Sequence, residues 1–492
     1  MAYTIGCDVG TQSLKGILVD PEGRNVAEAA RAYDVAFPEP SWADQDAEAW
    51  LTATAEVVAE LLATSGVPAS DIGTIGFASQ VDGVVAVGDD GRALRPAILW
   101  LDRRAEAQTA ALGARMGERE IFERTGLNLD SSHVAPKILW LAEQEPQVYD
   151  AATALLLPGS YVVHRLTGEA VVDYSNASST MIYDVGQRVW SPEMLGLTGI
   201  DVDRLGRIAP AREVAGTLTG PAAAELGLTP DTRVVVGCGD EHGACLGAGL
   251  VKPRLVCDIT GTAEPVAVAA DGPVFDDTKL VETHAHADER LWLIENPGFV
   301  SGGSVRWFSD NIAAASYDDM TPGAKAVPPG SEGLVFVPAL SGAMTPTWNG
   351  AAKGVFYGIS MKHDVHHFTR ALFEGCTFGF RDIIEQFDAM DIGGEEVRVV
   401  GGGAKSELWL QMKADATGRV LNTLAYPEAT ALGAAMLAGV AEGTFASLDE
   451  AAERVVELGD TYEPNAANKP AYDEAYGTYR TLYAALEDAM WS

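Results

Sequence analysis

A carboxylate in a glycine-rich setting, Asp240, is the first candidate for chemistry in this sequence. The β-branched run 234–236 before it predicts a buried strand, and the small residues 243–250 after it predict a helix. Open α/β sheets bind ligands where such strands end, and Gly237 and Gly239 leave the carboxylate unshielded by neighbouring side chains. Asp240 is therefore a candidate ligand contact, with a second interpretation in which it only caps the helix.

Two strand–turn–strand segments with Gly-Thr turns occur half a chain apart. Apolar strands flank the turn 10–13, with Asp8 directly before it, and the segment 256–268 repeats this pattern around a Gly-Thr at 261–262. Backbone N–H groups and hydroxyls in such turns bind phosphate oxygens, and a carboxylate beside them binds hydrated Mg²⁺. One such turn alone is more typical of an ordinary hairpin. The repeat predicts two similar α/β domains that face one cleft.

Polar side chains follow two predicted buried strands of the first half. The strand 72–78 leads to Gln80, Val81 and Asp82, and the apolar run that begins at residue 98 leads to Trp100 and Asp102. At one rim, carboxylates and amides would pair with hydroxyl groups, and an aromatic face would pack on sugar C–H groups. These residues predict a site for a polyhydroxylated ligand, with ordinary surface loops as the alternative.

A triple-glycine loop, 401–403, follows a predicted strand over 397–400. Ser406 after it is a suitable N-cap for a helix over 407–417. A bare backbone at a helix N-terminus approaches a nucleotide closely, so Gly402 and Gly403 are candidate nucleotide contacts. The small residues 427–435 predict a further helix that packs beside this loop.

Zinc is an alternative reading of two short segments. Their potential ligands are Cys238, His242 and Cys245 in one segment and His284, His286 and Asp288 in the other. The first set lacks a nearby fourth ligand, and small cysteines at a strand–helix junction are more often packing residues. The second set lies on one face if the segment is a strand, which makes it a minority hypothesis.

Length and charge limit the classes of function. A chain of 492 residues exceeds one hydrophobic core and predicts two domains, and a net charge of −36 argues against nucleic acid and anionic membranes as partners. Five scattered cysteines in apolar or Gly-rich segments predict free thiols. Without a signal-peptide pattern or a long apolar run, a cytoplasmic location is expected. A homodimer is left open.

Taken together, these motifs resemble the FGGY family of carbohydrate kinases, and within it most closely the xylulokinases. The resemblance spans nearly the whole chain. It is carried by Asp8-Val-Gly-Thr-Gln-Ser, Trp42-Ala-Asp-Gln-Asp, Ile98-Leu-Trp, Leu157-Pro-Gly-Ser-Tyr, Gly237-Cys-Gly-Asp, Thr260-Gly-Thr and Gly401-Gly-Gly-Ala-Lys-Ser-Glu-Leu-Trp.

The resemblance implies an α/β fold with two ribonuclease-H-like domains of the actin/hexokinase/Hsp70 superfamily that face a central cleft. The expected domains are 1–247, with the sugar site and the catalytic Asp, and 248–492, with the second phosphate turn and the adenosine loop. ATP and Mg²⁺ are the implied cofactors, with Asp8 and Asp240 beside the metal, and Asp240 is the implied general base toward a sugar hydroxyl. The implied ATP-binding residues are Asp8, Gly10, Thr11, Gln12, Ser13, Lys15, Gly261, Thr262, Gly402, Gly403 and Ser406. The implied sugar-binding residues are Gln80, Val81, Asp82, Trp100, Asp102 and Glu241.

Two positions depart from the xylulokinase pattern and affect the choice of sugar. Xylulokinases usually carry Met-His where this chain has Val81 and Asp82, and often Asn where it has Glu241. The expected substrate is a neutral ketopentose such as D-xylulose, with ribulose, a pentitol or a related polyol as alternatives. A non-enzymatic actin/Hsp70-like ATPase and a sugar sensor are the competing classes, and sugar-dependent ADP release separates them.

Overall fold

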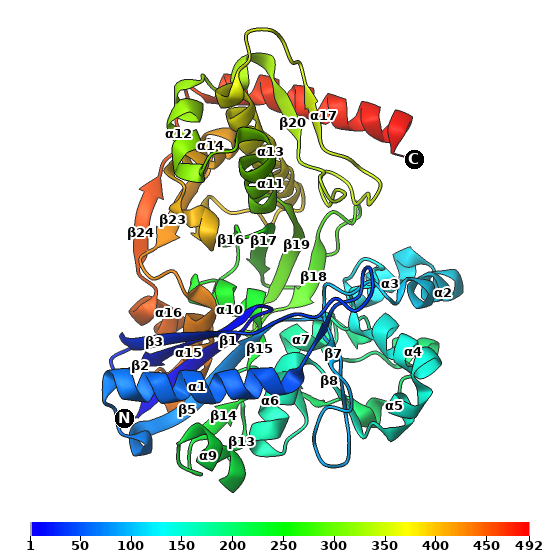
Figure 1. Ribbon diagram of the computed structural model, residues 1–492, viewed down its shortest axis with the longest axis vertical. Coiled ribbons are helices and arrows are strands. Elements are labelled where there is room, and N and C mark those ends of the chain that lie inside the picture. The colour runs from blue at the N-terminus through cyan, green and yellow to red at the C-terminus, as the bar shows by residue number, and fades with distance from the viewer. Residues whose placement is uncertain (1, 492) are drawn as a thin grey trace.

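Two mixed β-sheets organise the chain in the computed structural model, which describes residues 2–491. The first sheet has the order β13 (Val214–Thr217), β14 (Arg233–Val235), β5 (Ile72–Ser79), β1 (Tyr3–Val9), β2 (Ser13–Val19) and β3 (Asn25–Ala32), with β15 (Cys238–Gly239) also pairing with β5. The second has the order β18 (Glu282–Ala285), β19 (Trp292–Val300), β17 (Ala263–Ala270), β16 (Val256–Ile259), β22 (Glu396–Val400), β23 (Val420–Leu424) and β24 (Leu458–Tyr462). The sheets form the lower and upper lobes of Figure 1.

The two sheets share one core topology. In each, three antiparallel strands (β1–β2–β3 and β16–β17–β19) are extended by two parallel strands on the other side (β5–β14 and β22–β23). Asp8 pairs with Ala78 of β5, and its counterpart Asp258 pairs with Val399 of β22. The predicted pair of ribonuclease-H-like α/β units is confirmed, because strand order and direction both repeat.

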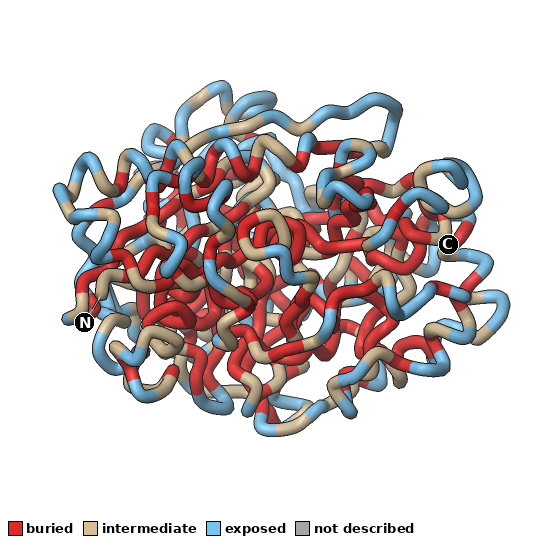
Figure 2. The backbone as a smooth tube through the Cα atoms, turned by 90° about the horizontal axis from the view of Figure 1, so that it is seen from below, coloured by how far each residue is buried: buried red, intermediate tan, exposed pale blue. Residues whose placement is uncertain are grey.

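Helices cover both faces of each sheet. In the first half they are α1 (Ala47–Ser65), α2 (Glu106–Met116), α3 (Glu118–Thr125), α4 (Val134–Gln144), α5 (Pro146–Ala151), α6 (Pro158–Thr167), α7 (Tyr174–Ser178), α8 (Pro192–Thr198), α9 (Gly220–Leu226) and α10 (Asp240–Gly247). In the second half they are α11 (Gly302–Phe308), α12 (Tyr317–Ala326), α13 (Val365–Ala389), α14 (Glu407–Thr417), α15 (Ala429–Glu442), α16 (Leu448–Val455) and α17 (Lys469–Met490). The central strands β1, β5 and β16 are buried at most positions because both faces of each sheet are covered. Figure 2 shows the buried segments concentrated in the interior.

Short strand pairs complete the lobes. They are β4 (Asp44–Gln45) with β7 (Ala97–Ile98), β6 (Val85–Val87) with β8 (Ala154–Leu156), β9 (Val171–Asp173) with β12 (Arg207–Ala209), β10 (Tyr183–Asp184) with β11 (Val189–Trp190), and β20 (Val335–Val337) with β21 (Val355–Tyr357). Within residues 2–491, no helix has the length and apolar character needed to cross a membrane.

Helices α10 and α15 cross between the two sheets and join the lobes. Residues of α15 pack in one core cluster with strands of the first sheet, whereas residues of α10 pack with strands of the second. The helices meet so closely that a Cβ on Gly247 would lie 1.9 Å from the Ala429 carbonyl oxygen, and one on Gly433 would lie 2.0 Å from the Gly243 carbonyl oxygen. Glycine is therefore required at the crossing.

The position of α15 corrects the sequence prediction, which placed this helix beside the triple-glycine loop. Its small residues instead fit against the first sheet, where Gly6 and Gly76 leave room for the α15 backbone. Two element boundaries also differ. The helix expected over 243–250 begins at Asp240 and ends at Gly247, whereas residues 296–298 lie inside β19.

Candidate active site

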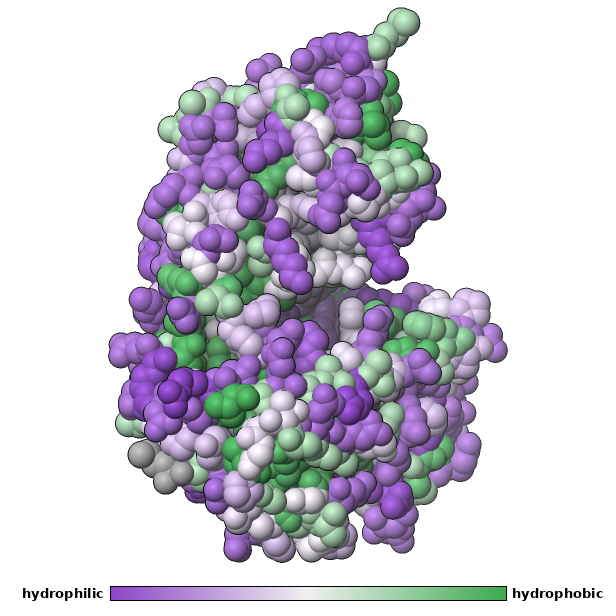
Figure 3. All heavy atoms as spheres, turned by 60° about the vertical axis from the view of Figure 1, so that its left-hand side comes forward, coloured by the Kyte–Doolittle hydropathy of each residue, from purple (hydrophilic) through white to green (hydrophobic). Residues whose placement is uncertain are grey.

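The first phosphate-type turn connects β1 and β2 beside Asp8. A hollow separates the two lobes of the molecule in Figure 3. The Gly10 N–H donates to the Ser13 carbonyl at 3.1 Å and closes the turn. The Tyr33 hydroxyl donates to the Gly10 carbonyl at 2.6 Å, and the side chain of Gln12 is exposed. Hydrogen bonds to Gly10 thus fix the conformation of the turn, while the Gln12 side chain remains accessible to solvent.

Lys15 returns from this turn directly opposite Asp8 in the β1–β2 register. Its ammonium group pairs with the Glu428 carboxylate at 2.7 Å, just before α15, and the two side chains are 42% and 32% exposed. Partly exposed ion pairs contribute only about 0–1 kcal/mol. Exchange of Glu428 for a phosphate group would therefore cost little.

Asp240 is the first residue of α10, and its position depends on a tight connection from β14. Gly237 adopts φ 85°, and a Cβ there would lie 2.3 Å from the Phe77 carbonyl oxygen. The Gly239 N–H donates to the Ser175 hydroxyl at 3.0 Å. Gly239, not Asp240, is the N-cap residue, so the capping interpretation of Asp240 is wrong.

The surroundings of Asp240 and Asp8 disfavour the ionised forms of both carboxyl groups. Burial raises the pKa of Asp240 to about 6, although its Oδ1 accepts the Glu241 N–H at 2.9 Å. Burial and then the charge of Asp240 raise the pKa of Asp8 to about 8, against a smaller opposing effect of Lys15. A cation between the two groups would favour their ionised forms.

This donor set fits Mg²⁺ bound with a nucleotide. Mg²⁺ prefers oxygen ligands, keeps several waters and is usually held by one or two carboxylates together with substrate phosphates. Among residues 2–491, no group of three or more His, Cys, Asp or Glu side chains could hold a metal ion. Asp8 and Asp240 therefore match a shared Mg²⁺–phosphate site and not a protein-only metal cage.

The second turn is built differently around Asp258, the counterpart of Asp8. The buried Lys413 ammonium donates to Asp258 at 2.6 Å and pairs with Glu264 at 2.8 Å, and the Thr260 hydroxyl donates to Asp258 at 2.7 Å. The carboxylate of Asp258 is thus neutralised inside the protein. Gly261 and Thr262 beyond it are exposed, which leaves their backbone and the Thr262 hydroxyl for a ligand.

The triple-glycine loop contacts this second turn. The Gly403 N–H donates to the Thr260 carbonyl at 3.0 Å, and a Cβ on Gly403 would lie 2.4 Å from the Thr260 side chain. Gly401, with φ 84°, and Gly402 are exposed. Ser406 is buried, and its hydroxyl accepts the Trp409 N–H at 3.2 Å as the N-cap of α14, so it shapes the loop and does not face a ligand.

Asp82 belongs to the expected sugar-binding residues and follows the end of β5. Its backbone is left-handed, with φ 58°. Its carboxylate is 3.4 Å from His133 Nδ1, which also contacts the Ser179 carbonyl at 3.0 Å. Burial opposes a charge on His133, but Asp82 and other nearby carboxylates outweigh it and raise the pKa of His133 to about 9. His133 was not among the predicted site residues, because nothing in its local sequence pairs it with Asp82.

Trp100 and Gln80 link the expected sugar-binding rim to the first phosphate-type turn. The indole N–H of Trp100 donates to the Thr11 hydroxyl at 2.9 Å, and the side chain is 37% exposed. Gln80 is buried and donates to Gln45 at 2.9 Å, with its own oxygen unpartnered among the described residues. Val81 packs against Gly239. Trp100 is thus positioned to contact a ligand, and Gln80 supports the rim from behind.

Asp102 is a correction to the predicted sugar-binding set. Its carboxylate accepts the Ala43 N–H at 2.6 Å and the N–H and side chain of Arg104 at 2.8 and 2.9 Å, and the side chain is 0% exposed. The Arg104 guanidinium in turn lies over the rings of Trp42 and Trp140, at 4.1 and 4.9 Å from the ring centres. Asp102 therefore stabilises the loop that carries Trp100 and is not free to bind a sugar.

Glu241, next to Asp240, faces buried acidic groups of the second lobe. Burial raises its pKa to about 7, and Asp240 adds to the shift against an opposing hydrogen bond with Glu295. Burial and Glu241 raise the pKa of Glu295, and Glu295 lies 3.1 Å from His284 Nε2. Two neighbouring carboxyl groups share protons readily when their charges repel. The charge of Glu241, at the start of α10, therefore acts on the Glu295 carboxyl group of β19.

Comparisons with known proteins agree with this geometry. The N-terminal domain of the FGGY family of carbohydrate kinases matches residues 3–247, and the C-terminal domain of that family matches residues 258–442. The chain belongs to the FGGY family of carbohydrate kinases. It is an enzyme of the phosphotransferase class with an alcohol group as acceptor, similar to xylulose kinases.

Relatives cover the whole length of this kinase. The xylulose kinase of Bacillus subtilis (strain 168) is 31% identical over 99% of this chain and 98% of its own. The gluconokinase of the same organism is 29% identical over 98% of this chain and 94% of its own. The crystal structure of ligand-bound xylulose kinase from Lactobacillus acidophilus superposes with a TM-score of 0.93 at 25% identity, covering 100% of this chain and 99% of that one.

The zinc alternatives are not supported in this carbohydrate kinase. All five cysteines are buried and free, as predicted, and no cluster of three metal ligands forms among residues 2–491. His284 lies in β18, but the strand ends at Ala285. His286 and Asp288 therefore do not continue its alternation, and Asp288 instead pairs with Arg290.

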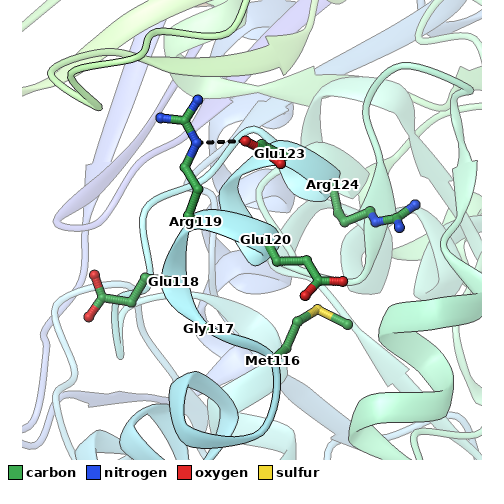
Figure 4. Close-up of a pocket in the computed structure, with 7 residues that line it drawn as sticks. All are labelled: Met116, Gly117, Glu118, Arg119, Glu120, Glu123 and Arg124. Carbon is green, nitrogen blue, oxygen red and sulfur yellow. Dashed lines mark hydrogen bonds and ion pairs between the residues drawn. The ribbon is translucent and has the colours of Figure 1, made fainter.

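One surface cavity contains none of the site residues named above. It has a volume of about 630 Å³ and is lined by residues 116–124 at the corner between α2 and α3 (Figure 4). Arg119 and Glu123 pair along α3 at 2.6 Å, and Glu118, Glu120 and Arg124 add three more charged side chains to the lining. Specific small-molecule sites are mostly apolar with a few placed polar groups, so we assign this cavity no ligand.

Proposed function

We propose that this kinase transfers the γ-phosphoryl group of ATP to a hydroxyl of a neutral sugar, a ketopentose such as D-xylulose. Asp240 is the general base, and the two Gly-Thr turns hold Mg-ATP. The observation that carries this proposal is the acidic setting beside the first turn, where the charge of Asp240, at the start of α10, raises the pKa of Asp8 in β1.

The reaction needs one proton acceptor and several charge-neutralising groups. Asp240 accepts the proton of the sugar hydroxyl, the hydroxyl oxygen forms a bond to the γ-phosphorus, and the bond to the β-phosphate oxygen breaks to release ADP. A pKa of about 6 keeps Asp240 mostly ionised at neutral pH and still basic enough to hold the proton. Bound Mg²⁺ would neutralise developing phosphate charge, with Asp8 and Asp240 as its protein ligands.

The binding residues divide between the lobes. Gly10, Thr11 and Lys15 on one side and Gly261 and Thr262 on the other would contact the phosphates. Gly402 and Gly403 would lie against the adenosine. The N-terminal unit, residues 1–247, would bind the sugar through Asp82, Trp100 and Glu241, and His133 would join them. Closure of the lobes about the α10–α15 crossing would exclude water from the phosphoryl group.

The charge of the sugar site supports a neutral substrate. Five carboxyl groups gather there: Asp82, Asp240, Glu241, Glu282 and Glu295. Two histidines oppose this charge in part, His133 beside Asp82 and His284 beside Glu282 and Glu295, which leaves an excess of acidic groups. An anionic sugar acid such as gluconate would meet repulsion from the carboxylates. The similarity to a gluconokinase makes gluconate the competitor to test.

A panel assay tests this proposal. Sugar-dependent ADP release is measured with Mg-ATP against D-xylulose, ribulose, pentitols, gluconate and no sugar. We expect a neutral ketopentose to give the highest kcat/KM and gluconate to give one at least ~10²-fold lower, since a site built for specific hydroxyls rejects mismatched analogues strongly. Gluconate as the best substrate would overturn the charge argument, and sugar-independent ATP hydrolysis alone would overturn kinase function. Five free thiols are consistent with the cytoplasmic location that we propose.

A further inference from the structure

A lysine that none of the steps above uses, Lys137 on α4, is completely buried in the first lobe. Among residues 2–491, no carboxylate forms an ion pair with it; its ammonium group donates to the carbonyl of Asp82 at 2.7 Å and to the carbonyl of Ser132. Burial lowers the pKa of Lys137 to about 7, against opposing effects of Asp82 and Asp102. A buried ammonium group without a carboxylate partner is costly, so its location calls for a reason beyond packing.

The first acceptor of Lys137 lies on a strained backbone. Asp82 has φ 58°, the left-handed region that non-glycine residues rarely adopt. Such a conformation persists only when surrounding contacts determine it, and it is frequent at ligand sites. The bond from Lys137 to the Asp82 carbonyl fixes the peptide plane directly after this residue and therefore the direction of the Asp82 side chain.

The second acceptor leads to the other member of the rim pair. Ser132 directly precedes His133, whose Nδ1 lies 3.4 Å from the Asp82 carboxylate. One ammonium group thus holds two backbone segments, and each segment carries one residue of the Asp82–His133 pair. The two segments are otherwise joined by the long connection through α2 and α3.

We propose that Lys137 is a positioning residue that holds Asp82 and His133 in the arrangement that binds the sugar. This inference rests on the proposed function, because it assumes that the pair contacts the substrate. A positioning role differs from a purely stabilising one in two measurable ways. Replacement of Lys137 must change the kinetic constants for the sugar and not those for ATP, and the change must depend on the presence of Asp82.

Lys137→Met removes the donors at similar length, and Lys137→Gln keeps shorter amide donors. We expect Lys137→Met to lower kcat/KM for the best sugar by ~10²-fold, a size typical of a misplaced contact, through KM more than kcat. The KM for ATP should change less than about twofold. Lys137→Gln should likewise affect the constants for the sugar and not those for ATP, with a smaller loss of kcat/KM for the sugar. Thr262→Val, on the second phosphate turn, is the crossed control and should change the KM for ATP and leave that for the sugar.

A double-mutant cycle with Asp82→Asn provides the decisive readout. Asn tolerates the left-handed backbone, so the single variant removes the charge and keeps the local fold. If Lys137 acts through Asp82, Lys137→Met should cost at most about threefold in kcat/KM once Asp82 is Asn, because the two losses are coupled. Additive losses, equal changes in the sugar and ATP constants, or failure of both Lys137 variants to fold would each overturn the proposal. Absence of sugar-dependent ADP release in the unchanged protein would instead overturn the proposed function.

Discussion

Asp240, at the start of α10, acts electrostatically on Asp8 of β1: after burial, the charge of Asp240 is the largest cause that raises the pKa of Asp8, to about 8. The partial neutralisation of Asp8 by Lys15 is weak because Lys15 pairs with Glu428. The repeat makes the contrast clear, since the counterpart Asp258 is neutralised by the buried Lys413. At these two equivalent positions, therefore, Asp8 lacks the buried lysine partner that Asp258 has, and a cation would stabilise its ionised form.

This pair predicts a particular dependence of stability on pH in Mg²⁺-free buffer. The folded-state pKa of Asp8, about 8, lies above its ordinary value of 3.8, so folding retains a proton between these pH values. The resulting stabilisation is complete below pH 4 and is lost as pH rises toward 8. Asp8→Asn should therefore unfold at a Tm at least ~2 °C above that of the unchanged protein at pH 8, with a smaller difference at pH 5.

Asp89→Asn, at an exposed position in the same lobe, is the matched control and should leave the pH dependence unchanged. Excess Mg-ATP should stabilise the unchanged protein more than Asp8→Asn. Parallel Tm-against-pH curves for Asp8→Asn and the unchanged protein would show that ionisation of Asp8 does not lower the stability of the folded protein.

Thr262→Val tests the second phosphate turn. Valine has nearly the shape of threonine and the side chain is exposed, so the fold should be unaffected. We expect the KM for ATP to rise about 5–30-fold through loss of a hydrogen bond to a charged phosphate, with the KM for sugar within about twofold. Steady-state kinetics with each substrate varied at saturation of the other measures both constants. A change confined to the sugar constants would be incompatible with the two-turn arrangement.

Asp82 should set preference among sugars. An ionised carboxylate only accepts hydrogen bonds, so it selects a substrate hydroxyl at its position, whereas the amide of Asn also donates. Asp82→Asn should change the rank order of kcat/KM among xylulose, ribulose and the pentitols, and Asp82→His should shift it further. The kcat/KM for the best sugar should fall by a smaller factor than the change in the ratios of kcat/KM between sugars. The same rank order in all three proteins would place Asp82 outside the sugar site.

The crossing of α10 and α15 should be intolerant of side chains. Gly247→Ala places a methyl group 1.9 Å from the Ala429 carbonyl oxygen and should lower the free energy of unfolding by about 1–3 kcal/mol. Gly477→Ala is the matched control, because this glycine of α17 has open space around its Cβ position; it should raise stability by about 0.5–1 kcal/mol. Denaturant unfolding measures both. Equal stability of the two variants would argue against close packing of the helices.

The parts of the fold that the sequence predicted were those carried by local patterns. Alternating apolar residues and turns identified the β1–β2 and β16–β17 hairpins, and Ser406 marked the start of α14. The placement of α15 could not be predicted, because its small residues fit any close partner and the glycines that accept it lie hundreds of residues away.

The site shows the same limit. Asp240 and the phosphate-type turns could be recognised from the residues that flank them in the sequence. The hydrogen-bond partners of a side chain could not be recognised in this way. Asp102 was expected to face a sugar, yet Arg104, two residues on, uses its oxygens. His133 and Lys137 were missed because their partner, Asp82, is reached only through the folded backbone. A polar residue at a strand end therefore identifies the rim, and only the fold separates ligand contacts from supporting bonds.

Sugar-dependent ADP release by Asp240→Asn is the measurement that tests the central claim most directly. Asn keeps the shape and the bond from the Glu241 N–H but cannot accept the proton of the sugar hydroxyl. We predict that the variant folds, binds nucleotide with unchanged affinity and loses ~10²–10⁴-fold in kcat with the best sugar. A folded Asp240→Asn variant with kcat within a few-fold of the unchanged protein would contradict the account, because Asp240 would then not be the general base.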